Sequence, residues 1–255
     1  MDRLDMPQVL RRLDAFFAED DMQSAGELLR EQLANARAVS DQAAMLSLRS
    51  EQVGYYRKTQ EEALAMEAID EALALCEQLS LSKTITGATV LLNCATTYKA
   101  FQRLSQALPL YARASVLYER LLPFLDYRQA GLCNNYALAL CDAGEYTQAL
   151  ALYQKALRIL QALGNNACDI AVTYVNIAHL YDAAGMPQKI PQSLQEAYAA
   201  LEAQPIAARD GYYAFCCSKC APSFQQFGFL QQGNILARRA QTIYQSKKSE
   251  NSLKI

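Results

Sequence analysis

Side-chain amides recur along this chain at a regular interval. Gln52, Asn93, Asn135 and Asn176 follow one another at spacings of 41, 42 and 41 residues. An amide carries both a donor and an acceptor, so it can hydrogen-bond to a peptide backbone without reading side chains. The spacing indicates one position in a recurring structural unit. If the four residues share one face, they form a ladder of groups that grip an extended peptide.

The sharpest local motif is Cys-Cys-Ser-Lys-Cys, formed around Cys216, Cys217 and Cys220. The spacing of Cys217 and Cys220 suits zinc or redox chemistry, but a structural zinc needs four ligands. The sequence offers no second such pair, and His179 is the one histidine of the chain. We therefore expect Cys217 and Cys220 to be core residues, with Cys216 more exposed and open to oxidation or cross-linking.

Other catalytic patterns are missing from the sequence. It contains no phosphate-binding glycine-rich loop and no His-Glu-x-x-His motif. A catalytic triad would have to be built around His179, which we expect to be internally satisfied or to contact a ligand. We therefore expect a protein that is not an enzyme and uses no metal and no cofactor.

Helices must position the amides. Glycine and proline are scarce, and apolar residues recur with helical periodicity almost from end to end. Residues 134–157 show the pattern most clearly, as two amphipathic helices around a turn at Gly144. Small residues such as Ala137 and Ala149 stand where helices must approach closely, and Tyr153 stands where a gap must be filled.

This arrangement resembles the tetratricopeptide repeat (TPR), whose pattern has a small residue in the first helix (helix A) and a turn glycine. Its second helix (helix B) carries alanines and an aromatic residue. The resemblance gives six units starting near residues 6, 46, 88, 130, 171 and 214. The period of about 42 residues exceeds the usual 34, as in kinesin light chain and in bacterial peptide-pheromone receptors of the Rap and PlcR type. It implies an all-α, right-handed TPR superhelix (α-solenoid) of about six helical hairpins over residues 1–245, with a polar tail at 246–255.

The resemblance also implies a binding wall. In TPR arrays helix A lines the inner wall, and the residue two before the small position of helix A faces it. Those residues here are Gln52, Asn93, Asn135, Asn176 and Lys219. Asparagine is a poor helix former, so its recurrence needs an explanation. One explanation is that the amides grip a peptide; the other is that each bonds a neighbouring helix and fixes the stacking of the repeats.

Residues about one turn further along the same wall are expected to supply specificity. They are Tyr55, Lys58, Lys99, His179 and Asp182. The wall thus mixes both charges, and the expected ligand is an extended protein or peptide segment whose backbone polar groups are unpaired.

Bulk properties limit the other partners and the location. A formal net charge of −2 gives no general attraction to nucleic acid or to an anionic membrane. The first residues lack an apolar signal core, and no apolar run approaches the roughly 20 residues that span a bilayer. We expect a cytoplasmic protein with mostly reduced, buried cysteines. The alternative function is a scaffold that self-associates as a homo-oligomer through its terminal repeats, which carry Phe16, Phe17, Phe227 and Phe229.

Overall fold

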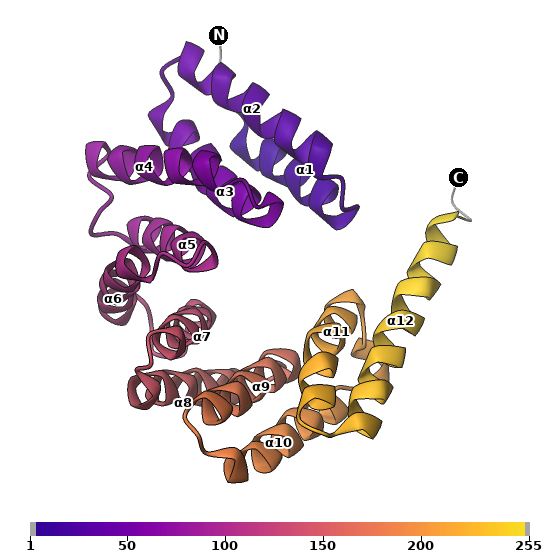
Figure 1. Cartoon of the computed structure of the whole chain (residues 1–255). Helices are drawn as coiled ribbons and strands as arrows, with labels where there is room; N and C mark the ends of the chain where they lie inside the picture. The colour runs from indigo at the N-terminus through magenta and orange to yellow at the C-terminus, as the bar shows by residue number, and fades with distance from the viewer. Residues whose placement is uncertain (1–3, 253–255) are drawn as a thin grey trace. The chain divides into compact units, whose positions relative to one another are not determined.

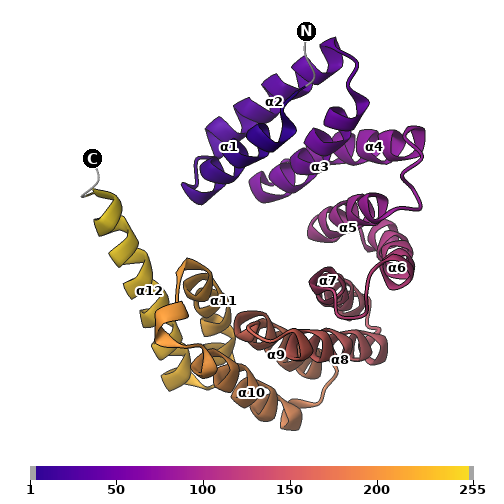
Figure 2. The same ribbon diagram turned by 180° about the vertical axis from the view of Figure 1, so that it is seen from behind.

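The computed structural model describes the backbone of residues 4–252 and the side chains of residues 4–246. This part of the chain forms twelve α-helices and two short 3-10 helices, and it contains no strand. Consecutive helices pair as antiparallel hairpins (Figures 1 and 2). The chain divides into two compact units, residues 1–122 and 123–255, which are described separately. The expected all-α fold of stacked hairpins is confirmed.

Unit 1 holds the first three hairpins. Its helices are α1 (Met6–Ala18), α2 (Met22–Ala38), α3 (Gln42–Thr59), α4 (Glu62–Gln78), α5 (Ile85–Ala100) and α6 (Leu104–Leu121). Aspartates begin the first three of these helices. Asp5, Asp21 and Asp41 each accept a hydrogen bond from the backbone N–H three residues further on, which satisfies a donor that the helix itself leaves unpaired.

Unit 2 holds the other three hairpins. Its helices are α7 (Tyr127–Asp142), α8 (Tyr146–Leu163), α9 (Ala167–Ala183), α10 (Ile190–Ala203), α11 (Gly211–Gln226) and α12 (Leu230–Ser252), with 3-10 helices η1 (Pro187–Lys189) and η2 (Ile206–Ala208) around α10. Asp126 caps α7, and Asp210 caps α11 by accepting from two backbone N–H groups. Helix α12 continues to Ser252, well into the segment expected to be a polar tail, and residues 253–255 lie outside the described residues.

The turns within the hairpins differ between the units. In unit 2 each of these turns places a glycine in the left-handed region, namely Gly144, Gly185 and Gly228. In unit 1 the same conformation is taken by Asp20, Gln60 and Gln102. A residue with a Cβ pays about 1–2 kcal/mol for this backbone conformation, which glycine adopts freely.

Small and large residues alternate in the cores as the sequence predicts. Ala137, Ala149 and Ala156 are fully buried, and so is Tyr153 between helices of unit 2. In unit 1, Tyr111 fills the corresponding position of α6 and is also fully buried. The helices A begin at residues 6, 42, 85, 127, 167 and 211. Five of them start three or four residues before the expected repeat start. In four of these five, α3, α5, α7 and α11, the side chain of the preceding residue caps the helix and so sets where it begins.

Candidate functional site

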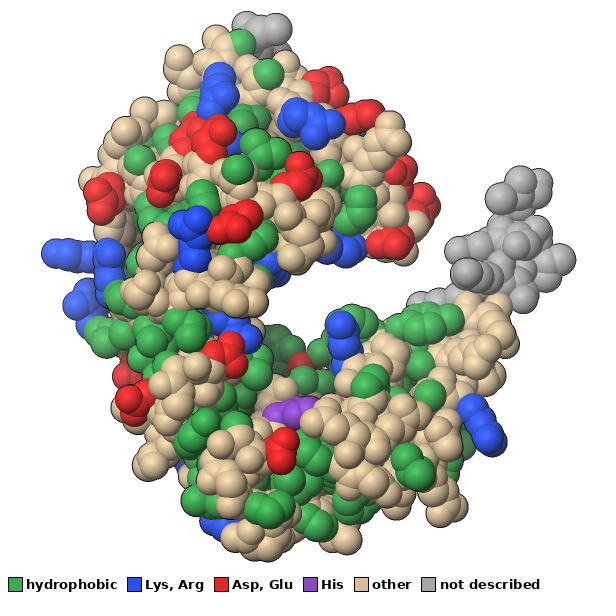
Figure 3. Space-filling view, viewed as in Figure 1, with side chains coloured by type: hydrophobic (Ala, Val, Ile, Leu, Met, Phe, Trp, Pro, Cys, Tyr) green, Lys and Arg blue, Asp and Glu red, His purple; other side chains and the backbone are tan. Residues whose placement is uncertain are grey.

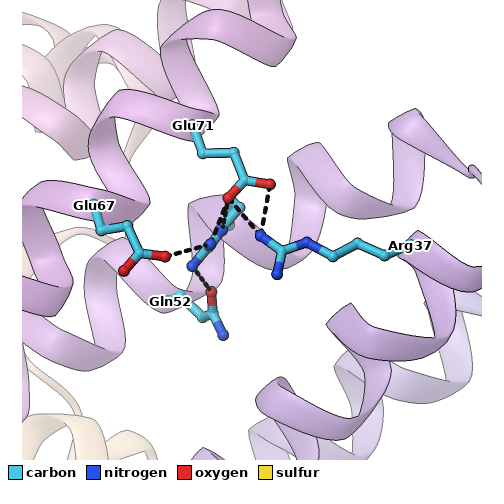
Figure 4. Close-up of polar contacts among 5 residues, drawn as sticks. Arg37, Gln52, Glu67 and Glu71 are labelled. Atoms are coloured by element: carbon cyan, nitrogen blue, oxygen red, sulfur yellow. Dashed lines mark hydrogen bonds and ion pairs between the residues drawn. The ribbon is translucent and has the colours of Figure 1, made fainter.

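Gln52 of unit 1 is buried inside a charged network and is not exposed on a surface. Arg49 lies one turn before it on α3, is only 4% exposed, and donates to the Gln52 amide oxygen at 2.8 Å. The same guanidinium binds Glu71 and Glu67 of α4, and Arg37 of α2 also binds Glu71 (Figure 4). Gln52 thus helps to satisfy a buried cation, which corrects its expected place in the ladder.

The carboxyl of Glu71 responds to this network. Burial acts to raise its pKa, but the hydrogen bonds and charges of Arg37 and Arg49 outweigh burial and hold the pKa below the ordinary value. The network joins α2, α3 and α4, so it fastens the first hairpin of unit 1 to the second.

Asn93 takes the structural role that the sequence left open. Its amide nitrogen, on α5, donates to the hydroxyl of Ser50 on α3 at 3.0 Å. On the same pair of helices, the buried hydroxyl of Thr97 donates to the Val53 carbonyl. Asn93 therefore ties two successive helices A together.

The three remaining site residues of unit 1 differ in accessibility. Tyr55, which we expected to contact a ligand, is instead buried, and its hydroxyl donates to the Met22 carbonyl at 3.0 Å. It is therefore a packing residue. Lys58 is exposed, forms an ion pair with Asp20 at 3.3 Å and lies over the ring of Phe17. Lys99 is half-buried near the end of α5.

Unit 2 presents its amides differently. Asn135 on α7 and Asn176 on α9 are both half-buried, and no described residue hydrogen-bonds to either side chain. The neighbouring Asn134 instead makes the bond between helices, donating to the Thr173 hydroxyl at 3.0 Å. In unit 1 the bond between successive helices A is made by Asn93, whereas in unit 2 it is made by the residue just before the corresponding position. The side chain of Asn135 is therefore left without a hydrogen-bond partner among the described residues.

Helices α7, α9 and α11 of unit 2 lie side by side (Figure 1). Asn135, Asn176 and the exposed Lys219 each stand two residues before a buried alanine of their helix. We call the surface that carries them the α7–α9–α11 face. Gly131 stands one turn before Asn135 on this face, and a Cβ added there would meet no atom within 4 Å. The face therefore has open space beside its first amide.

His179 and Asp182 stand further along α9. The ring of His179 is half-buried, shares a 2.7 Å hydrogen bond with the Ser223 hydroxyl and packs on Phe227 of unit 2. Burial lowers the pKa of His179 and outweighs the negative charge of Asp182, which acts to raise it. The ring is therefore neutral at pH 7. Asp182 is exposed.

The cysteine motif belongs to the core of unit 2. Cys216, Cys217 and Cys220 are all buried with Cys168 in one apolar cluster. The expected exposure of Cys216 is wrong, because that side of α11 packs against α9. Burial raises the pKa of the Cys220 thiol to about 12, which leaves it protonated and unreactive at neutral pH. Among the described residues, no three acidic, histidine or cysteine side chains are placed to hold a metal ion.

The sides of the two units that Figure 3 shows also differ in charge. Acidic and basic side chains are interspersed densely over the visible side of unit 1, whereas unit 2 shows few of either sign (Figure 3). In the described part of the chain, no helix has the length and apolar character needed to cross a bilayer.

Comparisons with known proteins agree with this architecture. Residues 129–203 match the family model of the tetratricopeptide repeat. The structure is similar to the crystal structure of BtubC (BKLC) from P. vanneervenii, with 24% identity, a TM-score of 0.69, and coverage of 78% of this chain and 80% of that one. A second similar crystal structure is described as the nearly identical TPR-like repeats of a kinesin light chain from Podosopora anserina. It is 17% identical in sequence, and the TM-score is 0.59. That match covers 79% of this chain and 96% of the other.

The chain has no match among curated protein sequences. The similarity to solved structures is therefore the evidence for the fold, and the match over residues 129–203 is the evidence for the repeat family of that segment. Hairpins α7–α8 and α9–α10, which this match covers, contain the turn glycines and the buried alanines that first suggested the repeat. Residues 129–203 thus carry tetratricopeptide repeats, and the rest of the described chain continues the same fold of helical hairpins.

Proposed function

We propose that this protein is a non-enzymatic interaction module that binds an extended peptide segment on the α7–α9–α11 face. The observation that carries the proposal is the pair Asn135 and Asn176. Both amides are half-buried on successive helices A, and both lack a hydrogen-bond partner among the described residues. TPR proteins in general bind protein partners, which supports the broader function.

The physical reason is the cost of a poorly solvated amide. A half-buried amide that no neighbour bonds keeps its donors and acceptor for a ligand or for water. An extended backbone offers unpaired N–H and C=O groups at regular spacing, so it can satisfy both asparagines. Asn134 already links the helices, so packing does not require the amide at Asn135.

Specificity would come from the side chains around the amides. On unit 2 these are Lys219, His179 and Asp182, of which Lys219 and Asp182 are exposed. His179 is neutral at pH 7 and would contribute packing and hydrogen bonding, not charge. Lys58 and Lys99 of unit 1 stay predictions as ligand contacts; for Lys58, a ligand would have to replace the ion pair with Asp20.

Selection from a random displayed peptide library on the full chain tests the proposal. We expect peptides selected on the wild type to lose at least about tenfold in affinity for Asn135→Ala/Asn176→Ala, since each lost amide removes hydrogen bonds worth about 1 kcal/mol. Asn35→Ala, an amide of α2 outside the face, is the matched control and should bind normally. Equal binding to the double variant and the wild type would contradict the proposal.

Gly131 provides a second, steric arm of the test. Gly131→Leu fills the open space on the face, and Gly131→Ala adds one methyl group at the same place. Both changes should raise the free energy of unfolding slightly, because glycine inside a helix costs about 0.5–1 kcal/mol relative to alanine. We expect only the leucine to reduce peptide affinity strongly, which separates blocked binding from damaged folding.

Self-association through the last hairpin is a second candidate function, favoured by one observation. A groove of about 460 Å³ is lined by residues of α11 and α12 and has a largely apolar lining that includes Ala221, Pro222, Ala240 and Tyr244. The expected terminal aromatics Phe227 and Phe229 do not line it, because they pack against the unit 2 core. A molar mass in solution that stays at one chain over a wide concentration range would remove this candidate.

A further inference from the structure

Three residues at the beginning of successive helices A form a cluster that the proposed function does not use. Tyr127 opens α7, Asp169 lies in the first turn of α9, and Tyr212 lies in the first turn of α11. Both tyrosine hydroxyls donate to the same oxygen, Oδ1 of Asp169, at 3.0 and 2.6 Å. The spacings of 42 and 43 residues match the repeat period, and this was the sequence signal that could have revealed the cluster.

The cluster is accessible and rich in aromatic surface. Tyr127 and Tyr212 are each 49% exposed, and Phe215, whose ring stacks on that of Tyr212, is 47% exposed. Phe124 and Leu125 add exposed apolar surface just before α7. Large aromatic side chains left half in water on one face are typical of interaction sites.

The chemistry of the cluster suits a cation. The two tyrosine hydroxyls donate to Oδ1 of Asp169, and no described side chain hydrogen-bonds to Oδ2. The neighbouring aromatic rings can add to the attraction, because the face of an aromatic ring attracts positive charge. The ring of Phe215 already holds such a contact, since the Lys219 ammonium lies 5.5 Å from its centroid. Arginine and lysine side chains combine a cation with an apolar stem, so they satisfy the carboxylate and the rings together.

The position of the cluster connects it to the amides. Tyr127 lies two helical turns before Asn135 on α7, and Asp169 lies about two turns before Asn176 on α9. Residues at such spacings share one side of a helix, so the cluster forms the end of the α7–α9–α11 face at which these helices begin. A peptide held by Asn135 and Asn176 would place a neighbouring side chain over Asp169.

We propose that Asp169, held by Tyr127 and Tyr212, recognises an arginine or lysine side chain of the segment bound on the α7–α9–α11 face. This inference rests on the proposed function. It gives the ligand a defined feature, one basic residue anchored at the beginning of the three helices.

A double-mutant cycle on the full chain tests the inference. Peptides selected from the random library should share one arginine or lysine, and changing this residue to glutamine should lower affinity for the wild type about tenfold. The same peptide change should have little effect on binding to Asp169→Asn, because the partner charge is already gone. Asp169→Asn keeps an oxygen that both tyrosine hydroxyls can reach, so the helices should remain tied. Thermal unfolding of this variant checks that point, and Glu27→Gln on α2 serves as the matched loss of an exposed carboxylate.

The outcomes separate the two proposals. Selected peptides that need Asn135 and Asn176 but share no basic residue, or whose basic residue matters equally in Asp169→Asn, would overturn the inference and leave the proposed function standing. Selected peptides that bind Asn135→Ala/Asn176→Ala as well as the wild type would overturn the proposed function. A library that yields no binder overturns both.

Discussion

The two units are built from the same kind of helical hairpin but use its polar positions in opposite ways. In unit 1 the ladder amides are used inside the fold: Gln52 bonds Arg49, and Asn93 bonds Ser50. In unit 2 Asn135 and Asn176 have no bonding partner among the described residues, while Asn134 links the helices in their place. A regular spacing therefore identifies a structural position, and the neighbours of that position decide whether the side chain fastens the fold or remains for a ligand.

The difference extends to the source of stability. Unit 1 combines a buried charged network with strained turns, whereas unit 2 has glycine turns and a large apolar cluster that includes four cysteines. A buried cation is stable only while its partners remain, so unit 1 depends on a few side chains more than unit 2 does.

The largest effect should come from removing Glu71. Glu71→Gln takes from Arg49, which is almost fully buried, its main carboxylate partner, and should lower the free energy of unfolding of unit 1 by about 3 kcal/mol. Glu67→Gln is the matched control and should cost less than about 1 kcal/mol, since the Glu67 side chain is 63% exposed. Amide hydrogen exchange, read separately for each unit, measures both. A loss for Glu67→Gln as large as that for Glu71→Gln would show that Glu71 is not the main partner.

The same network sets a pH dependence. Because the folded pKa of Glu71 lies below the ordinary value near 4.5, its contribution is complete above that pH and is lost as the pH falls through the folded pKa. Glu71→Gln should therefore flatten the acid side of the stability profile of unit 1.

The turns should give a smaller effect of opposite sign in the two units. Gly144→Ala forces a Cβ into the left-handed region and should destabilise unit 2 by about 1 kcal/mol. Gln102→Gly relieves the same conformation in unit 1 and should stabilise it by about 0.5 kcal/mol, after the greater freedom of glycine in the unfolded chain is subtracted. Denaturant titration of the two variants tests the pair. A stabilising Gly144→Ala would mean that backbone strain does not distinguish the turns.

The sequence was sufficient for the fold and for only part of the site. The alanines and tyrosines of the repeat each have one packing environment, so their pattern predicted the hairpins and the buried Tyr153. The fate of an amide depends on what stands across from it. Asn93 finds Ser50 43 residues earlier, while the residue at the same distance before Asn176 is Cys133, a weak acceptor.

The expected exposure of Gln52 on the binding wall is wrong for a related reason. The repeat register placed it on the binding wall, but Arg49 one turn earlier, with Glu67 and Glu71 on the next helix, draws it into the network. The presence of Arg49 in the middle of an apolar helix was the available signal, since a buried arginine must gather acceptors. Side-chain spacing within one helix cannot show which of two adjacent residues reaches the neighbouring helix, as Asn134 and Asn135 illustrate.

The smallest effect concerns the pH at which each unit begins to weaken. Burial lowers the pKa of His179 in unit 2, so folding is favoured by the neutral ring. A depressed folded pKa gives a contribution that is present above the ordinary value of 6.5 and is lost as the pH falls through the folded pKa. Unit 2 should thus begin to lose stability as the pH falls below 6.5, where the Glu71 carboxylate of unit 1, whose pKa is lowered, is still ionised. Hydrogen exchange at pH 7, 6 and 5 measures this for each unit, and His179→Gln, which can keep a hydrogen bond to Ser223, should remove the loss. A decline in unit 2 that persists in His179→Gln would assign the acid sensitivity to another group.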